Sequence, residues 1–140
     1  MSASRKHKIA PVPDAWKTAV IAILKKGGHA DVLWTGRAQS NWQSIGDSGF
    51  KDEAHDFLIR QLRSSGLLGH DHPDMLDSLD HSICETWAFL CPHPQGFPTQ
   101  IYAKIALHGQ LIRINLISLH IDLTKELENA IHVYLQPKKS

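Results

Sequence analysis

The chain has 140 residues, of which 42% are hydrophobic and 21% are charged, and its net charge is +1 with the histidines counted as neutral. These values are typical of one globular domain, and so small a net charge argues against strong general attraction to nucleic acid or to a membrane surface. No apolar run approaches the length of a membrane span, and the N-terminus lacks the apolar region of a secretory signal. The two cysteines form neither a CxxC motif nor a disulfide framework, so we expect a reducing, cytoplasmic location.

The N-terminal third predicts a short leader followed by two helices. Residues 1–13 are expected to form a flexible basic leader, and residues 14–140 a single domain. Asp14 can cap a helix that the Gly27-Gly28 pair ends. Its apolar residues recur at helical spacing: Trp16, Val20, Ile23 and Leu24. A second helix is predicted over about residues 37–47.

The next segment predicts a third helix and then a loop. Residues 50–66 carry an apolar stripe at helical spacing, and Asp52 and Glu53 suit the positive end of the helix dipole in its first turn. The stripe consists of Phe50, Ala54, Phe57, Leu58 and Leu62. Residues 66–80, "GLLGHDHPDMLDSLD", are polar and broken by glycine and proline, which is typical of a loop.

The C-terminal part predicts strands and one more helix. Residues 82–90 are rich in strand formers, and residues 101–120 read as a β-hairpin around a His-Gly turn. Thr124 can cap a last helix, which ends before Pro137. The expected class is therefore α+β, with N-terminal helices packed on a three-stranded antiparallel sheet and a C-terminal helix.

Cations occur in both arms of the predicted hairpin. Because alternate residues of a strand share a face, Tyr102 and Lys104 are expected on the face away from the core, and Arg113 joins them from the second arm. The doublet at 116–117 disturbs the alternation, and a β-bulge there would turn Ser118 and His120 to the same face.

This set of side chains suits phosphate chemistry. Lysine and arginine neutralise a phosphate and stabilise charge that develops on it, while tyrosine and histidine move protons. The sequence places no carboxylate in the patch. The alternative is that this face of the sheet is exposed to solvent and that its lysine and arginine side chains are hydrated and bind no ligand.

The chain resembles the MqsR-type toxins of bacterial toxin–antitoxin systems, which belong to the RelE-like group, from about Leu33 to His120. The resemblance rests on the order of motifs: "DSGF" (47–50), "KDEAHDFLIRQL" (51–62), "LLGHDHPD" (67–74), "DHSICETWAF" (80–89), "IYAKIAL" (101–107) and "ISLH" (117–120). It implies a RelE-like domain that cleaves mRNA without a metal or cofactor, through attack of a 2′-OH on the adjacent phosphate. It also implies two partners, RNA and a cognate antitoxin protein, and no membrane.

The resemblance also implies roles for single residues. Lys104 would stabilise the phosphate in the transition state, His120 would be a general base or acid, and Tyr102 would position the 2′-OH or protonate the leaving group. The expected RNA-binding residues are Arg113, His70, His72 and Glu85. The chain departs from the family pattern in having "SLH" for "SFH" and no clear basic residue in the loop, where His70 or His72 would substitute.

Two other functions remain open from the sequence. The polar sheet face suits a non-enzymatic module that binds another protein. The loop "HDHPD", with nearby carboxylates, resembles a divalent-metal site, although such residues are more often turn formers. Metal-dependent hydrolysis around His70 and His72 would be sensitive to EDTA, whereas the toxin-like reaction would not.

Overall fold

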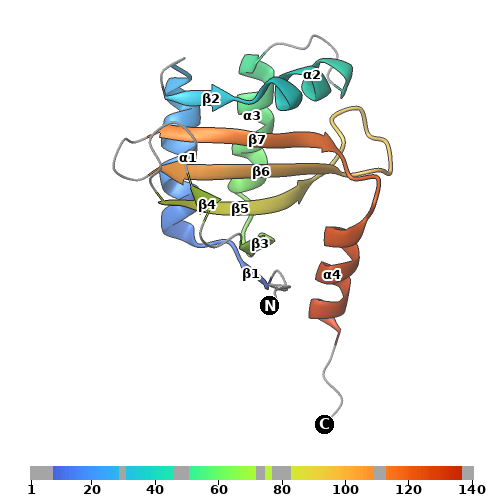
Figure 1. Cartoon of the computed structure of the whole chain (residues 1–140). Helices are drawn as coiled ribbons and strands as arrows, with labels where there is room; N and C mark the ends of the chain where they lie inside the picture. The colour runs from blue at the N-terminus through green and yellow to red at the C-terminus, as the bar shows by residue number, and fades with distance from the viewer. Residues whose placement is uncertain are drawn as a thin grey trace.

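The computed structural model describes residues 8–28, 31–45, 51–71, 75–76, 83–108 and 113–136. They form a twisted sheet with helices on one face and a further helix at one end of the other face (Figure 1). The helices are α1 (Asp14–Lys26), α2 (Gly36–Ile45), α3 (Lys51–Leu62) and α4 (Glu126–Leu135). The strands are β1 (Ile9–Pro11), β2 (Val32–Trp34), β3 (Leu68–Asp71), β4 (Met75–Leu76), β5 (Ile83–Cys91), β6 (Ile101–His108) and β7 (Arg113–Ile121).

The predicted class, α+β, is confirmed, but the sheet is larger than the three strands expected. Its strands follow the order β1-β3-β5-β6-β7-β2, and β4 pairs with β5 outside this path. The antiparallel trio β5-β6-β7 lies at the centre as predicted, whereas β2 joins the edge of β7 in parallel.

The additional strands lie in segments that the sequence predicted as leader, linker or loop. Strand β1 belongs to the predicted leader, β2 to the apolar run between the first two helices, and β3 and β4 to the predicted loop 66–80. These strands have only two to four residues. Such short segments show no alternation, and their partners lie far away in the sequence, so local patterns do not reveal them.

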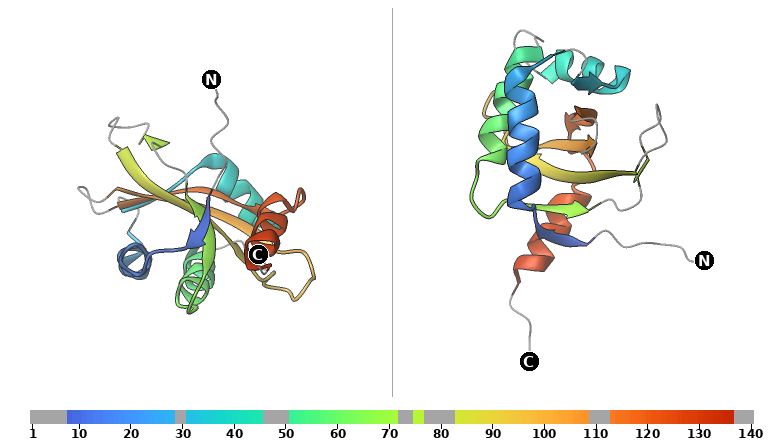
Figure 2. Two further views of the ribbon diagram at one scale, coloured as in Figure 1. Left: turned by 90° about the horizontal axis from the view of Figure 1, so that it is seen from below. Right: turned by 90° about the vertical axis from the view of Figure 1, so that its left-hand side faces the viewer.

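The end of α1 and the start of α2 follow local sequence signals, but the predicted cap of α1 is wrong: Asp14 is its first helical residue, the proline before it stands at the cap position, and no side chain caps the helix there. Helix α1 ends at Gly27, which adopts the left-handed conformation with φ 64° and donates its N–H to Ile23 O. Helix α2 starts after Thr35, whose Oγ1 accepts the N–H of Ala38 at 3.1 Å. Helices α1 and α3 lie side by side on one face of the sheet (Figure 2).

The main core lies between the sheet and helices α1, α2 and α3. On the sheet side it contains Phe89, Ile105 and Leu116, all fully buried. Trp16 packs edge-on against Phe89 with ring centroids 6.5 Å apart, and its indole N–H donates to Glu85 O. The central strands therefore have one face fixed by a large apolar core.

A smaller core covers part of the opposite face. Leu127 of α4 is buried against Ala88 and Leu90 of β5, with Tyr102 and Ile131 packed beside them. This face was expected to stay open, and α4 covers only one end of it.

None of the helices in the described parts of the chain is long and apolar enough to cross a membrane.

Candidate functional site

A β-bulge between β6 and β7 builds the site. Tyr102 pairs with His120 and Lys104 with Ser118, but the next pair is Ile105 with Leu116. Ile117 is therefore the extra residue, as predicted for this doublet. Because of the bulge, Ser118 and His120 share the face of Tyr102 and Lys104.

A hydrogen bond from α2's N-terminus anchors the bulge. The hydroxyl of Thr35 donates to Ile117 O at 3.0 Å and at the same time accepts the N–H of Ala38. One side chain thus connects the start of α2 to the irregular point of β7.

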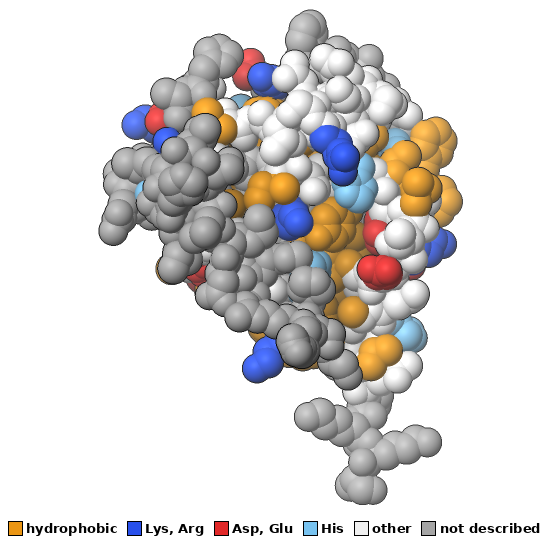
Figure 3. All heavy atoms as spheres, in the orientation of Figure 1, with side chains coloured by type: hydrophobic (Ala, Val, Ile, Leu, Met, Phe, Trp, Pro, Cys, Tyr) orange, Lys and Arg blue, Asp and Glu red, His pale blue; other side chains and the backbone are white. Residues whose placement is uncertain are grey.

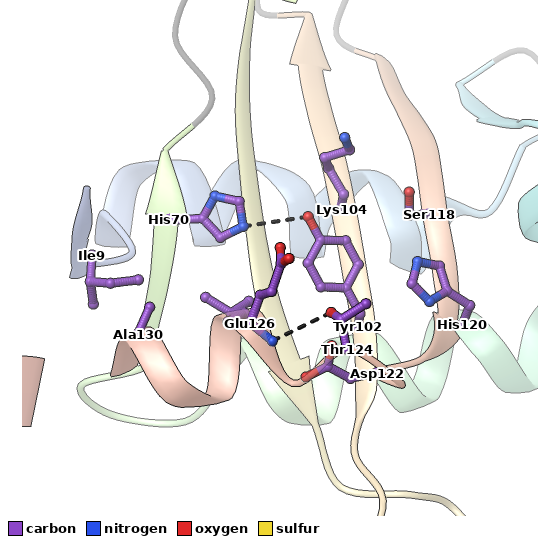
Figure 4. A pocket seen from close by; sticks show the side chains of 11 residues that line it. Ile9, His70, Tyr102, Lys104, Ser118, His120, Asp122, Thr124, Glu126 and Ala130 are labelled. Atoms are coloured by element: carbon purple, nitrogen blue, oxygen red, sulfur yellow. Dashed lines mark hydrogen bonds between the residues drawn. The ribbon is translucent and has the colours of Figure 1, made fainter. Parts of the chain in front are cut away.

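Tyr102, Lys104, Ser118 and His120 meet in a pocket of about 350 Å³ at the end of the sheet that α4 covers (Figure 4). The lining side chains are Ile9, His70, Tyr102, Lys104, Ser118, His120, Asp122, Thr124, Glu126, Leu127 and Ala130. On this face of the molecule, basic, imidazole and acidic side chains border hydrophobic surface (Figure 3). The pocket therefore combines an apolar wall with groups of both charges.

Two contacts fix the orientation of the His120 ring. It stacks on Tyr102 with centroids 5.1 Å apart and planes 20° apart. Its Nδ1 lies 2.9 Å from Ile121 O. Because a carbonyl oxygen only accepts hydrogen bonds, Nδ1 carries the proton, and in the neutral ring Nε2 keeps its lone pair. Nε2 is thus the atom that can accept a proton from a substrate.

Tyr102 is held as a neutral phenol. Burial, and then the negative charges of Asp122 and Glu126, raise its pKa to about 12. Its hydroxyl lies 3.4 Å from Nε2 of His70, and the two rings are tilted by 41°. At neutral pH this phenol keeps its proton and can donate a hydrogen bond into the pocket.

Lys104 lies two residues after Tyr102 on β6, and its side chain is on the same face of the strand. Burial lowers the pKa of its ammonium group from the usual value. Within the parts of the chain that the structure describes, Lys104 forms no ion pair. Its charge is thus partly desolvated, and no carboxylate among the described residues neutralises it, which is the condition under which a lysine attracts an anion strongly.

Two carboxylates line the pocket, although the sequence placed none there. Asp122 is only 4% exposed, and Glu126 lies in the first turn of α4. Burial, Glu128 and Glu126 raise the pKa of Asp122, against the backbone hydrogen bond from Lys125 and the charge of His120. The acids in "DLTKE" directly after the last strand were the available signal: Asp122 continues the pairing of β7 with the chain before β6, and the packing of α4 on the sheet brings Glu126 into the site.

The residues predicted to bind RNA do not all lie in the pocket. His70, on β3, lies in the pocket beside Tyr102. Arg113 pairs with His108 at the opposite end of the hairpin and does not line the pocket. Glu85 is exposed and shares the β5 face of Trp87, which packs in the helix-side core. His72 and the whole motif at 47–50 lie outside the described residues.

Two further observations concern the metal site that the sequence left open and the similarity of the chain to other proteins. Among the described residues, no group of three or more histidine, cysteine, aspartate or glutamate side chains is placed to hold a metal ion. Much of the loop "HDHPD", from residue 72 on, is outside that description. Comparisons of the chain with models of protein families, with curated proteins and with solved structures found no match.

Proposed function

We propose that this chain is a metal-independent endoribonuclease that acts as the toxin of a toxin–antitoxin system. The observation that carries the proposal is the convergence of a phenol, an ammonium and an imidazole in one pocket, produced by the bulge at Ile117. These three groups supply a proton donor, a fixed positive charge and a base without a metal. The resemblance to the MqsR-type toxins points to the same three positions.

The proposed reaction starts at His120. Its Nε2 takes the proton of a ribose 2′-OH, whose oxygen then attacks the adjacent phosphorus. Lys104 stabilises the charge that develops on the non-bridging phosphate oxygens. The bond from phosphorus to O5′ breaks, and O5′ takes a proton from the Tyr102–His70 pair, whose atoms are in hydrogen-bond range. The products are a 2′,3′-cyclic phosphate and a 5′-hydroxyl, and no atom comes from a cofactor.

The biological partners follow from this activity. A nuclease that cleaves cellular RNA must be held inactive, so we expect a small antitoxin protein that covers the pocket or blocks Lys104. The exposed surface next to the pocket offers such a protein apolar contacts. It includes Leu123, Val133, Tyr134 and Leu135, all at least 49% exposed.

Expression in a bacterial host tests the proposal. The wild-type chain should arrest growth and fragment mRNA, and Lys104→Met should do neither at equal protein level. Co-expression of the product of the neighbouring gene should restore growth. Intact mRNA during arrest, or equal toxicity of the variant, would remove the nuclease from the explanation.

The same exposed apolar residues favour a second candidate function. A non-enzymatic module would bind another protein through α4 and the adjacent end of the sheet. In that case, substitution of Lys104 would leave partner binding intact, whereas Val133→Asp on the exposed side of α4 would weaken it. RNA cleavage by the purified chain distinguishes the two functions.

A further inference from the structure

A second pocket lies between helix α3 and the connection from β5 to β6. Its volume is about 290 Å³, and its lining side chains are Phe57, Arg60, Gln61, Pro92, His93 and Pro94. Phe57 also belongs to the helix-side core, whereas the pocket around Lys104 opens on the opposite face of the sheet. The two pockets share no lining residue, so an inference about the second one does not depend on the proposed function.

Helix α3 forms one wall of this second pocket. Phe57, Arg60 and Gln61 are three and four positions apart, so they lie on the same side of the helix. The Phe57 ring is buried, whereas Arg60 is exposed. Gln61 Nε2 donates a hydrogen bond to Leu90 O at 2.7 Å. This bond connects the helix to the end of β5 and fixes the orientation of the amide, so that Oε1 is its available acceptor.

The opposite wall holds the imidazole of His93 in one orientation. The backbone N–H of Gln95 donates to its Nδ1 at 3.1 Å, and the N–H of Gly96 donates to the His93 carbonyl oxygen at 2.9 Å. The ring of Phe97 packs against the imidazole edge-on, with centroids 4.8 Å apart. Because Nδ1 accepts a hydrogen bond, the neutral ring carries its proton on Nε2. Nε2 is therefore a hydrogen-bond donor whose position is fixed by the turn.

Three polar groups of the walls have no partner in the parts of the chain that the structure describes. His93 Nε2 and Gln61 Oε1 form no hydrogen bond there, and neither is a buried atom, so both are accessible. Arg60 forms no ion pair, although Asp56 is one helical turn away. The pocket thus presents an N–H donor, a cation and an acceptor beside the apolar surface of a phenyl ring and two prolines.

This combination fits a ligand with three features. One guanidinium and one imidazole N–H suit a carboxylate, which accepts paired hydrogen bonds from arginine. The Gln61 oxygen repels the additional oxygens of a phosphate and instead accepts an N–H. The apolar walls suit a hydrocarbon side chain. A polypeptide carries a carboxylate, an amide N–H and a side chain on one α-carbon only at its last residue, and capture of that end is a recurring mode of recognition.

We propose that this second pocket binds the C-terminal residue of a partner polypeptide that ends in an apolar side chain. Arg60 and His93 hold the carboxylate, and Gln61 Oε1 accepts the N–H of the same residue. Phe57 and the two prolines contact the side chain. The volume is at the low end of the range for ligand pockets, from about 300 Å³, which suits one residue.

Titration of the isotope-labelled chain with the acetylated tripeptide Ala-Ala-Leu, followed by NMR, tests the proposal. The amide signals of residues 60–61 and 93–97 should shift, and those around Lys104 should not. The peptide with a free carboxylate should bind at least about 10-fold more tightly than the same peptide with a C-terminal amide. No binding, equal binding of the two peptides, or shifts confined to other residues would overturn the proposal.

Arg60→Met removes the charge and keeps the hydrocarbon stem of an exposed side chain, so the fold should be retained. Affinity for the free-carboxylate peptide should fall by about 10-fold or more. Arg63→Met is the matched control, because Arg63 is exposed directly after α3 and does not line the pocket. Unchanged affinity in Arg60→Met would exclude its guanidinium from the site, and equal losses in both variants would show only general attraction of an anion.

Smaller anions distinguish a polypeptide end from other sources of the same chemistry. Isocaproate, which is the leucine skeleton without the amide, should bind more weakly than the tripeptide because nothing donates to Gln61. Free leucine should also bind more weakly, because its ammonium approaches Arg60. Inorganic phosphate at the concentration of the peptide should not displace it. Equal binding of isocaproate or free leucine would assign the pocket to a small acid, displacement by phosphate would assign it to phosphate, and either result would overturn the proposal.

Discussion

At the scale of single residues, burial fixes the protonation states on which the proposed reaction depends. The pKa of Tyr102 is raised to about 12 and that of Lys104 is lowered, in both cases chiefly because the side chains are taken out of water. A neutral phenol and an incompletely hydrated ammonium are thus placed side by side on β6. Among the described residues, no opposite charge of the protein pairs with Lys104, so its ammonium group remains available to a substrate.

Lys104→Met should separate activity from stability. RNA cleavage should fall by about 100-fold or more, because the charge that stabilises the phosphate is lost. The free energy of unfolding, measured with urea, should stay the same or rise, because the substitution removes a partly buried charge that no described residue pairs with. Lys26→Met, on an exposed residue at the end of α1, should retain wild-type cleavage. Parallel losses of activity and stability in Lys104→Met would point to a structural lysine.

The phenol of Tyr102 should make stability fall at high pH. Since its pKa is raised in the folded state, the stabilisation is complete below the usual value of 10 and is lost as the pH rises toward 12. The loss should be on the order of 2 kcal/mol. Urea unfolding of the wild-type chain and of Tyr102→Phe across this range measures it. The stability of the wild-type chain relative to Tyr102→Phe should fall by that amount as the pH rises from 10 to 12, and a constant difference would contradict the assignment.

At the scale of secondary-structure elements, the site depends on contacts that fix the strands on either side of β6. The bulge in β7 is fixed by Thr35 at the start of α2, and the position of His70 is fixed by the pairing of β3 with β5. Both contacts join segments distant in sequence. Substitutions outside the pocket are therefore expected to disturb it.

Thr35→Val should destabilise the chain by about 1–2 kcal/mol, because it removes both the helix cap and the hydrogen bond to Ile117 O. Thr35→Ser retains the hydroxyl and serves as the control. RNA cleavage should fall in the valine variant, since His120 follows the bulge closely. Denaturant unfolding and cleavage rates measure the two effects, and equal behaviour of valine and serine would show that the bulge needs no anchor.

Gly69→Ala should displace β3. A Cβ atom at this position would collide with Ala88 O and press on Val12, so the strand must move away from β5 and take His70 with it. We expect a loss of about 2 kcal/mol or more. Gly36→Ala is the control, because its Cβ meets nothing within 4 Å. Denaturant unfolding that ranks the two variants equally would contradict the tight approach of β3.

At the scale of the whole molecule, the two faces of the sheet differ in how much of each is buried under helices. The helix-side face is closed by α1, α2 and α3 and supplies most of the buried apolar surface. The opposite face carries a small core under α4, and the pocket opens beside it. Polar groups on this second face can thus be partly buried without weakening the main core.

The parts of this architecture that follow from local patterns were predictable. The amphipathic stripes of α1 and α3, the alternation in β6 and the doublet that makes the bulge are all readable in the sequence, and they place Tyr102, Lys104 and His120 together. Pairings between distant segments were not predictable. Strands β1, β2 and β3 are too short to show a period, and Glu126 enters the pocket because Leu127 docks α4 on the sheet.

Analysis of the RNA ends made by the purified chain in the presence of EDTA tests the central claim most directly. The account predicts cleavage that EDTA does not inhibit, with 2′,3′-cyclic phosphate and 5′-hydroxyl ends, and a rate at least about 100-fold lower for His120→Ala. RNA that stays intact, ends that carry a 5′-phosphate, or wild-type rates in the alanine variant would contradict it.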